Sequence, residues 1–271
     1  MFDDVHFDKR AIATAARVLK KANARYGSGE MERFNHAFRI LSGRVELEPP
    51  PYPWQKPDFY VPGVPAKTWY GPDEIPQMSV VEAAYETIKR ELLNILNHRS
   101  GFGMPTPINQ GIVKTGAWEF FWVKDGCKKF EENWALCPET RRLIDSLPRV
   151  GESAIFSALQ PGTHINPHCG VFNLRLTLHL PLIVPENCEL RVAEETRGWE
   201  EGKCVVFNDS FVHESSNYSE SSRYNLVFDI WHPDLSAAEI QVLEELLHLL
   251  DPPTPRHQAT SSGGPSDEPT N

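Results

Sequence analysis

Short segments with the alternating pattern of β-strands fill the second half of the chain, and they constrain its fold most. In 174–184, the side chains of Arg175, Thr177 and His179 share one face and a row of leucines shares the other. Residues 223–231 alternate in the same way. Further strand-like runs occupy 118–123, 153–159, 189–193 and 203–208. From 153 onward, regular short strands separated by turns, without intervening helices, predict an all-β sandwich or barrel.

Helical patterns lie on both sides of this β region. Residues 8–26 and 32–42 predict two helices near the N-terminus, and 137–147 predicts a short one within the β region. Apolar side chains at three- and four-residue spacing predict a helix over 80–97, behind a Ser79–Glu82 capping box. Ser236 and Glu239 predict the start of a last helix. The fold class is therefore mainly β with flanking helices (α+β).

A segment rich in proline and aromatic residues, 48–76, separates the first helices from the rest. Its nine prolines exclude regular helix, and its aromatic side chains predict a strap packed on the body of the protein. We expect a helical N-terminal region over 1–110 that includes this strap, and a β domain over 111–250 that ends in a helix. Residues 251–271 hold no large apolar side chain and predict a disordered tail.

Charge and hydropathy exclude several classes of protein. The chain has 27 Lys and Arg against 37 Asp and Glu, a net charge of −10, which disfavours general nucleic-acid binding. The sequence contains neither a secretory signal pattern nor an apolar run long enough for a membrane anchor. Its five cysteines are odd in number and lack CxxC spacing. Reduced thiols and a cytoplasmic location are the expectation.

Three histidines lie within the β region: His168, His179 and His213. Imidazole is a good ligand for divalent iron, zinc or copper. Arg175 and Arg223 fall on the polar strand faces, so a cavity lined by these faces would bind an anion. The alternative is an outward-facing surface of salt bridges, and alternation alone does not decide between them.

The spacing of these residues favours one kind of metal site. His213 follows His168 by 45 residues and Arg223 follows His213 by ten. This layout suits an iron oxygenase that uses 2-oxoglutarate, with the arginine binding the far carboxylate of the cosubstrate. Such enzymes generally ligate iron with two histidines and one carboxylate. The usual position of that carboxylate, two residues after the first histidine, is Gly170 here.

Residues 118–235 resemble the aspartyl/asparaginyl β-hydroxylase family. The resemblance rests on Gln160-Pro-Gly-Thr-His164, Pro167-His-Cys-Gly170, Leu178-His-Leu180, Trp199-Glu-Glu-Gly202, Phe207-Asn-Asp-Ser-Phe211 with His213-Glu214, and Asp229-Ile-Trp-His-Pro233. It implies a double-stranded β-helix (jelly-roll, cupin-like) core that binds Fe(II) with two histidines and no carboxylate, and uses 2-oxoglutarate and O2. The first 110 residues show no resemblance that we can name.

The resemblance also implies roles for individual residues. His168 and His213 are the expected iron ligands and catalytic residues. Arg223 and Ser157 are expected to bind the distal carboxylate of 2-oxoglutarate, and His179 lies near the other carboxylate. Trp118 belongs to the same pocket. Where the animal hydroxylase of the family has an arginine, this chain has Thr177, and Arg175 is the candidate replacement. Asp209 and Glu214 are candidates for orienting the ligand histidines through their free ring N–H groups.

The expected function is hydroxylation of an unactivated carbon. The β-carbon of an aspartyl or asparaginyl residue is the first candidate, in a peptide, protein or amino-acid-like substrate. One alternative is a hydroxylase or halogenase that acts on a small molecule or lipid. The other is a non-catalytic jelly-roll protein that binds a ligand. The sequence does not specify the oligomeric state.

Overall fold

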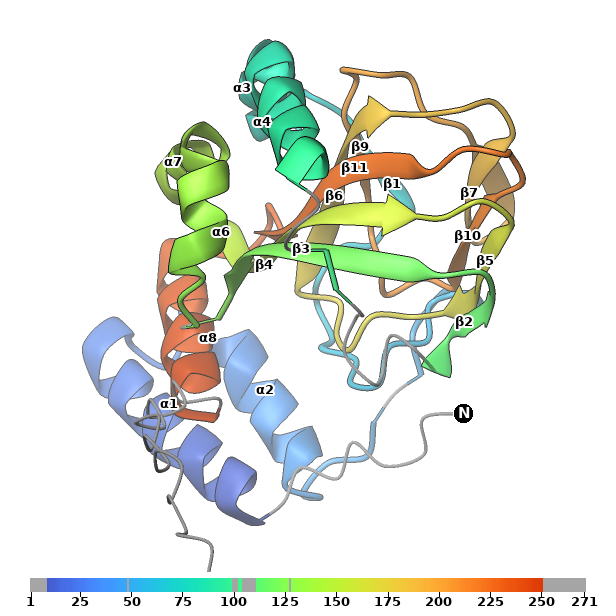
Figure 1. The fold of residues 1–271 in the computed structure, drawn as a ribbon. Coiled ribbons are helices and arrows are strands. Elements are labelled where there is room, and N and C mark those ends of the chain that lie inside the picture. Colours follow the sequence, from blue (N-terminus) through green and yellow to red (C-terminus); the bar gives the residue numbers. More distant parts are fainter. Residues whose placement is uncertain (1–8, 48, 99–101, 104–110, 127, 251–271) are drawn as a thin grey trace, which may run out of the picture.

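Two antiparallel sheets pack face to face in the computed structural model, which describes residues 9–47, 49–98, 102–103, 111–126 and 128–250 (Figure 1). The six-stranded sheet has the order β1 (Trp69–Tyr70), β9 (Val205–Phe207), β6 (Arg175–Ile183), β11 (Arg223–Trp231), β4 (Val150–Leu159), β3 (Trp118–Asp125). The five-stranded sheet has the order β2 (Val113–Thr115), β5 (Thr163–His168), β10 (His213–Asn217), β7 (Cys188–Val192), β8 (Glu195–Arg197). From β4 to β7, and again from β9 to β11, successive strands alternate between the two sheets. The predicted double-stranded β-helix is confirmed.

The helices form two groups around this core. The first group covers the outer face of the six-stranded sheet and contains α3 (Gln77–Ala83), α4 (Tyr85–His98), α6 (Glu131–Leu136) and α7 (Pro138–Ser146) (Figure 1). The second contains α1 (Lys9–Tyr26), α2 (Glu32–Leu41) and α8 (Ala237–Leu250), and packs at one end of the sheets. No helix in the described part of the chain is long and apolar enough to cross a membrane.

The leucine face of β6 points outward from the barrel, under the first helix group. Leu176, Leu178 and Leu180 are fully buried and pack with the apolar faces of α3, α4 and α7. Because side chains alternate along a strand, Arg175, Thr177 and His179 then point between the two sheets. The polar faces therefore line a cavity, which excludes the outward-facing alternative.

Two predicted helices have different bounds in the structure. The helix expected over 80–97 begins at Gln77 and is divided at Ala84. Ser79 lies inside α3 rather than capping it, and the carboxylate of Glu82 accepts a hydrogen bond from the backbone N–H of Cys204 at 2.8 Å. The helix expected over 137–147 is α7, with α6 directly before it. At α8 the capping box is present as predicted, because Ser236 and Glu239 bond each other's backbone N–H.

The proline-rich segment follows the surface of the barrel. Phe59 forms a bridge with Phe172, and the side chain of Asn173 both accepts from the N–H of Val61 (2.8 Å) and donates to its carbonyl (2.9 Å). Trp69 belongs to β1, so residues before 110 add an edge strand to the six-stranded sheet. The expected boundary at 110 and the tail 251–271 lie outside the described residues.

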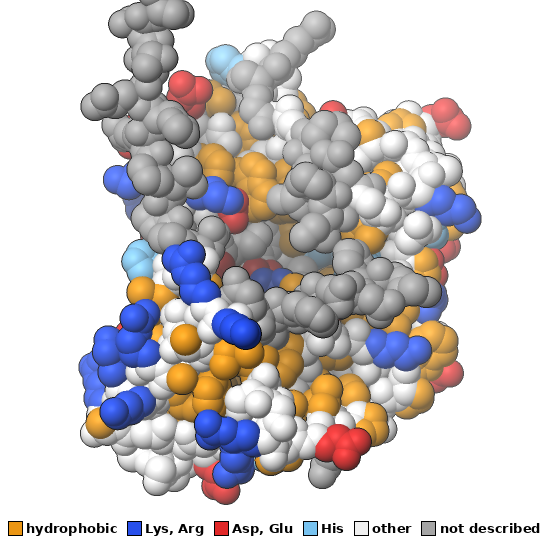
Figure 2. Space-filling view, turned by 90° about the horizontal axis from the view of Figure 1, so that it is seen from below, with side chains coloured by type: hydrophobic (Ala, Val, Ile, Leu, Met, Phe, Trp, Pro, Cys, Tyr) orange, Lys and Arg blue, Asp and Glu red, His pale blue; other side chains and the backbone are white. Residues whose placement is uncertain are grey.

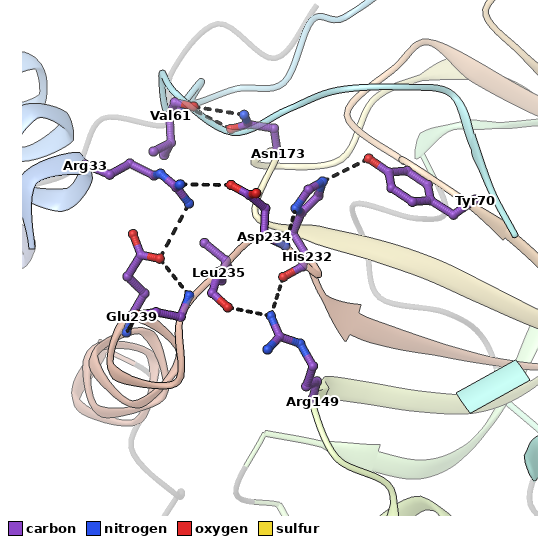
Figure 3. Close-up of polar contacts among 10 residues, drawn as sticks. Arg33, Val61, Tyr70, Arg149, Asn173, His232, Asp234, Leu235 and Glu239 are labelled. Atoms are coloured by element: carbon purple, nitrogen blue, oxygen red, sulfur yellow. Dashed lines mark hydrogen bonds and ion pairs between the residues drawn. The ribbon is translucent and has the colours of Figure 1, made fainter. Parts of the chain in front are cut away.

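Polar contacts tie the second helix group to the barrel (Figure 3). Arg149, directly before β4, donates to the backbone carbonyls of His232 (2.5 Å) and Leu235 (2.8 Å), between β11 and α8. Arg33 of α2 pairs with Asp234 (3.0 Å) and Glu239 (3.5 Å). These bonds connect the end of β11, the start of α8 and helix α2.

Candidate active site

A cavity of about 570 Å³ lies between the two sheets. All seven candidate site residues line it: Trp118, Ser157, His168, Arg175, His179, His213 and Arg223. Arg223 begins β11, and Asp229 lies six residues further along the same strand face. At roughly 3.3 Å per residue these two positions are about 20 Å apart. The cavity therefore has two distinct ends, named here the Arg223 end and the Asp229 end.

His168 and His213 lie opposite each other where β5 ends and β10 begins. Their ring centroids are 4.1 Å apart. The Nδ1 of His168 is 2.8 Å from the carbonyl of Asn166, and the Nδ1 of His213 is 2.9 Å from the carbonyl of Phe211. A carbonyl only accepts, so each Nδ1 carries the proton and each Nε2 keeps its lone pair.

Burial also keeps these two imidazoles neutral. It lowers the pKa of His168 to about 3, with a further contribution from neighbouring His213, and the pKa of His213 to about 4. A neutral imidazole with a free Nε2 is the form that ligates a metal. Backbone groups, which for His213 include that of Asp209, contact the two rings, so the role expected for the carboxylates of Asp209 and Glu214 was wrong. Glu214 instead pairs with Arg191 at 2.5 Å and lies 3.3 Å from His164.

The space beside Gly170 is filled by Asp209. A Cβ added to Gly170 would lie 2.3 Å from Oδ2 of Asp209, and the Gly170 N–H donates to the Asp209 carbonyl at 2.6 Å. A carboxylate side chain at position 170 would therefore displace Asp209. Within the described residues, no three His, Cys, Asp or Glu side chains are grouped as a metal cluster, which leaves the two histidines as a pair.

Arg223 is a buried cation without an anionic partner among the described residues. Only 2% of the residue is exposed. Its Nη1 donates to Ser215 Oγ at 3.3 Å, its guanidinium lies 4.7 Å from the centre of the Trp199 ring, and its Nε has no hydrogen-bond partner. Burial lowers the pKa of Arg223 to about 10, so it stays charged at neutral pH. A buried, unpaired charge costs several kcal/mol, about the amount that an anionic ligand would recover.

Three further candidates gather at the Arg223 end. The indole N–H of Trp118 donates to Ser157 Oγ at 2.9 Å, across neighbouring strands β3 and β4. The His179 ring stacks on Trp199 at 6.1 Å between centroids, and its Nδ1 is 3.4 Å from Asn225 Nδ2. Burial and the charge of Arg223 hold the pKa of His179 well below 6.5. This end therefore offers one cation with hydroxyl, imidazole and amide groups, a set suited to a carboxylate.

Arg175 lies at the other end of the cavity. Its Nη1 is 3.1 Å from Asp229 Oδ2 and its Nε is 3.7 Å from Asp209 Oδ2. Burial raises the pKa of Asp229 to about 6 against the opposing effect of Arg175. Arg175 is thus engaged by two carboxylates and lies apart from Arg223, and its expected contact with the cosubstrate stays a prediction.

Three residues that surround Arg223 and His179 in the structure had no role predicted from the sequence: Trp199, Ser215 and Asn225. Trp199 belongs to one of the motifs that carry the family resemblance, and Asn225 shares the polar face of β11 with Arg223. The motif around Trp199 and the strand face of Asn225 were therefore both visible in the sequence. Ser215 lies on β10, whose sequence HESSN does not alternate in hydropathy and was not predicted as a strand.

The sequence model described as Aspartyl/Asparaginyl beta-hydroxylase matches residues 82–233, which include every candidate site residue. The chain belongs to this family. It is 33% identical over 192 residues to the human protein named Aspartyl/asparaginyl beta-hydroxylase, a match that covers 68% of this chain and 25% of that protein. It is 32% identical over 236 residues to human Aspartate beta-hydroxylase domain-containing protein 2, covering 83% of this chain and 63% of the relative.

A third relative comes from Rhizobium tropici and is named Ornithine lipid ester-linked acyl 2-hydroxylase. It is 31% identical over 175 residues, covering 62% of both chains. The matches therefore cover between 25% and 63% of the length of these three relatives.

Proposed function

We propose that this chain is an Fe(II)- and 2-oxoglutarate-dependent dioxygenase that hydroxylates a carbon of an amino-acid residue in a peptide or related substrate. Its membership of a hydroxylase family supports the reaction type. The relatives are named as hydroxylases of aspartate and of a lipid. Their names therefore support hydroxylation, but they do not support one particular substrate. The cytoplasmic location expected from the cysteines stays a prediction.

The observation that carries this proposal is the buried guanidinium of Arg223. It lines the cavity and is charged, but it has no carboxylate partner among the described residues. A ligand carboxylate at this point would accept from Arg223 and from the Ser157 hydroxyl, whose oxygen Trp118 holds in place. 2-Oxoglutarate carries such a carboxylate at the end distant from its 2-oxo acid group.

The two histidines fit a bound iron ion. Each presents a neutral ring with Nε2 free and Nδ1 anchored by a backbone carbonyl. Imidazole is a normal ligand for Fe(II), and the contact between Gly170 and Asp209 leaves no room for a third side chain at position 170. Iron held by His168 and His213 would supply the redox chemistry, in which 2-oxoglutarate becomes succinate and CO2, and O2 provides the oxygen of the new hydroxyl group.

The surrounding protein positions the cosubstrate and limits access of water. His179 stacks between the site and Trp199, and Phe207 packs edge-on against both His179 and His213. These apolar contacts fix the imidazoles and lower the local dielectric constant. Charge interactions at Arg223 are correspondingly stronger than they would be in water.

The test compares Arg223→Ala with wild type by succinate release in the presence of Fe(II), O2 and ascorbate. We expect the 2-oxoglutarate KM to rise by at least about 30-fold, since losing one partner of a buried charge pair costs about 2–5 kcal/mol. Arg191→Ala, which removes an arginine outside the cavity, is the control and should leave this KM unchanged. His213→Ala should lose Fe(II) binding in a direct titration.

An unchanged KM in Arg223→Ala would refute the role of that residue. Wild-type protein that neither binds Fe(II) nor converts 2-oxoglutarate would favour the ligand-binding alternative. Mass spectrometry of the product distinguishes the remaining alternative, since a halogenase adds chlorine where a hydroxylase adds oxygen.

A further inference from the structure

One side chain at the Arg223 end comes from an exposed loop. Trp199 lies between β8 and β9, and both of its neighbours, Gly198 and Glu200, are exposed. Its ring centre lies 4.7 Å from the guanidinium carbon of Arg223, and the ring stacks on His179 with 13° between the two planes. Trp199 is not among the described residues that line the cavity. Any effect of Trp199 on a ligand there would therefore act through Arg223 and His179.

The orientation of Arg223 depends on few contacts. Its hydrogen bond to Ser215 Oγ is 3.3 Å long, and burial removes the water that would otherwise solvate the charge. The face of an indole ring attracts a cation, and the attraction is stronger where water is excluded. The ring carries no charge, so it holds the guanidinium without neutralising it. Trp199 therefore orients the cation and leaves its hydrogen-bond donors for a carboxylate ligand.

The same indole ring restricts His179. Phe207 also contacts this imidazole, with 83° between the ring planes, so two aromatic side chains fix it. Burial and the positive charge of Arg223 keep the pKa of His179 well below 6.5, so the ring is neutral at physiological pH. A neutral imidazole does not repel the neighbouring guanidinium.

Helix α4 anchors the loop that carries Trp199. The carboxylate of Glu201 accepts hydrogen bonds from the Tyr85 hydroxyl (2.9 Å), the Lys89 ammonium (2.5 Å) and the Val184 backbone N–H (3.0 Å). Three donors on one carboxylate fix the loop two residues after Trp199. The indole ring is therefore held in place before any ligand binds.

We infer that Trp199 is a positioning residue, which holds the guanidinium of Arg223 in the orientation that binds the distal carboxylate of 2-oxoglutarate. The buried Nε1 of Trp199 has no hydrogen-bond partner, so contacts of the ring, rather than a hydrogen bond, hold the indole against Arg223. This inference rests on the proposed function and adds to it a residue that lies outside the cavity lining.

The experiment measures 2-oxoglutarate affinity by calorimetry on the full chain, with Fe(II) present and O2 excluded. Trp199→Leu keeps an apolar side chain but removes the aromatic face, and we expect it to weaken binding by at least about tenfold. Trp199→Phe keeps an aromatic face and should stay within about threefold of wild type. An unchanged affinity in Trp199→Leu, or equal losses in the two variants, would overturn the inference.

Trp134→Leu is the matched control. Trp134 of α6 also packs against an arginine, with the guanidinium carbon of Arg141 4.1 Å from its ring centre. Neither residue is among the described residues that line the cavity, so this variant should keep the wild-type affinity for 2-oxoglutarate. A loss as large as that in Trp199→Leu would show a general effect of removing a packed tryptophan, and would also overturn the inference.

A double-mutant cycle tests whether Trp199 acts through Arg223. In the Arg223→Ala background, Trp199→Leu should lower the affinity by less than about twofold more, because the group that it positions is absent. A further loss of about tenfold would indicate an effect independent of Arg223 and would refute the inference.

Circular dichroism and Fe(II) titration check that Trp199→Leu folds with its histidine pair intact. The wild-type protein separates this inference from the proposed function. Wild type that does not bind 2-oxoglutarate refutes the proposed function. Wild type that binds it, together with Trp199→Leu that binds it equally well, refutes only the role of Trp199.

Discussion

At the scale of single residues, backbone contacts set the chemistry of the histidines. The carbonyls of Asn166 and Phe211, each two residues before a candidate ligand, fix the proton on Nδ1. His232 shows the opposite tautomer, because its Nδ1 accepts from the N–H of Asp234 at 3.2 Å while its Nε2 lies 2.9 Å from the Tyr70 hydroxyl. Thus the hydrogen bonds of their neighbours fix two different tautomers in three histidines of one chain.

The burial of His232 predicts a pH dependence of stability. Burial lowers its pKa to about 4 in the folded protein, against about 6.5 when unfolded. The unfolded chain therefore binds more protons between these values, and stability falls as pH drops from 6.5 towards 4. The difference in unfolding free energy between wild type and His232→Gln should change by up to about 1.4 kcal/mol per pH unit in this window.

Urea titrations at several pH values measure this difference, and using the variant as reference cancels the other titrating histidines. A difference that stays constant from pH 7 to pH 4 would contradict the assignment. Above pH 7 the difference should be flat.

At the scale of elements, polar side chains join segments that the pairing of β-strands does not connect. Asn173 is fully buried, and its side chain pairs with Val61 as a neighbouring strand would. It accepts a hydrogen bond from the Val61 N–H and donates one to the Val61 carbonyl. Its neighbour Phe172 forms a bridge with Phe59, so the proline-rich segment is held there by backbone and side-chain bonds together. Proline lacks an N–H, which explains why a segment with so many prolines needs an asparagine for pairing.

Asn173→Ala should lower the free energy of unfolding by about 2–4 kcal/mol, because it leaves a buried N–H and a buried carbonyl unpaired. Chemical denaturation measures the change. Limited proteolysis should show faster cleavage within 55–65. Asn173→Asp keeps the acceptor for the Val61 N–H, so we expect it to protect the segment better than alanine does; equal effects of both variants would argue against this bonding pattern.

At the scale of the whole molecule, the second helix group packs on the end of the barrel that follows β11. Trp231, the last residue of β11, is 1% exposed and joins a core cluster with Val18, Phe34 and Val242 from α1, α2 and α8. Helix α1 carries six Lys or Arg side chains and no Asp or Glu, and Figure 2 shows Lys and Arg gathered at the left of the face that it draws. A chain with net charge −10 therefore has a locally basic surface on this helix.

Trp231→Ala should cost about 3–5 kcal/mol of unfolding free energy, because it opens a cavity between the helices and the barrel. Denaturation monitored by circular dichroism checks this value. Tyr218→Ala removes an aromatic side chain from a residue that is 60% exposed and should change stability by less than about 0.5 kcal/mol. Comparable losses in the two variants would show that Trp231 does not join the two parts.

The long alternating strands were predictable, and the short polar ones were not. β6 and β11 carry a clear two-residue period, because one face packs under helices and the other faces the cavity. β5 and β10 lack this period, yet they hold both candidate iron ligands. Their sequences, THINPH and HESSN, are rich in residues typical of turns, and pairing with neighbouring strands overrides that preference.

The sequence by itself determined the strand faces, the spacing of His168, His213 and Arg223, and the family resemblance, because these depend on local order along the chain. Only the tertiary structure decided that the polar faces point inward, since either face satisfies the same alternation. It also decided which carboxylates pair with Arg175. These partners, Asp209 and Asp229, lie 34 and 54 residues away along the chain and contact Arg175 only when the sheets assemble. Charge pairing depends on distance in space, and spacing along the chain does not encode it.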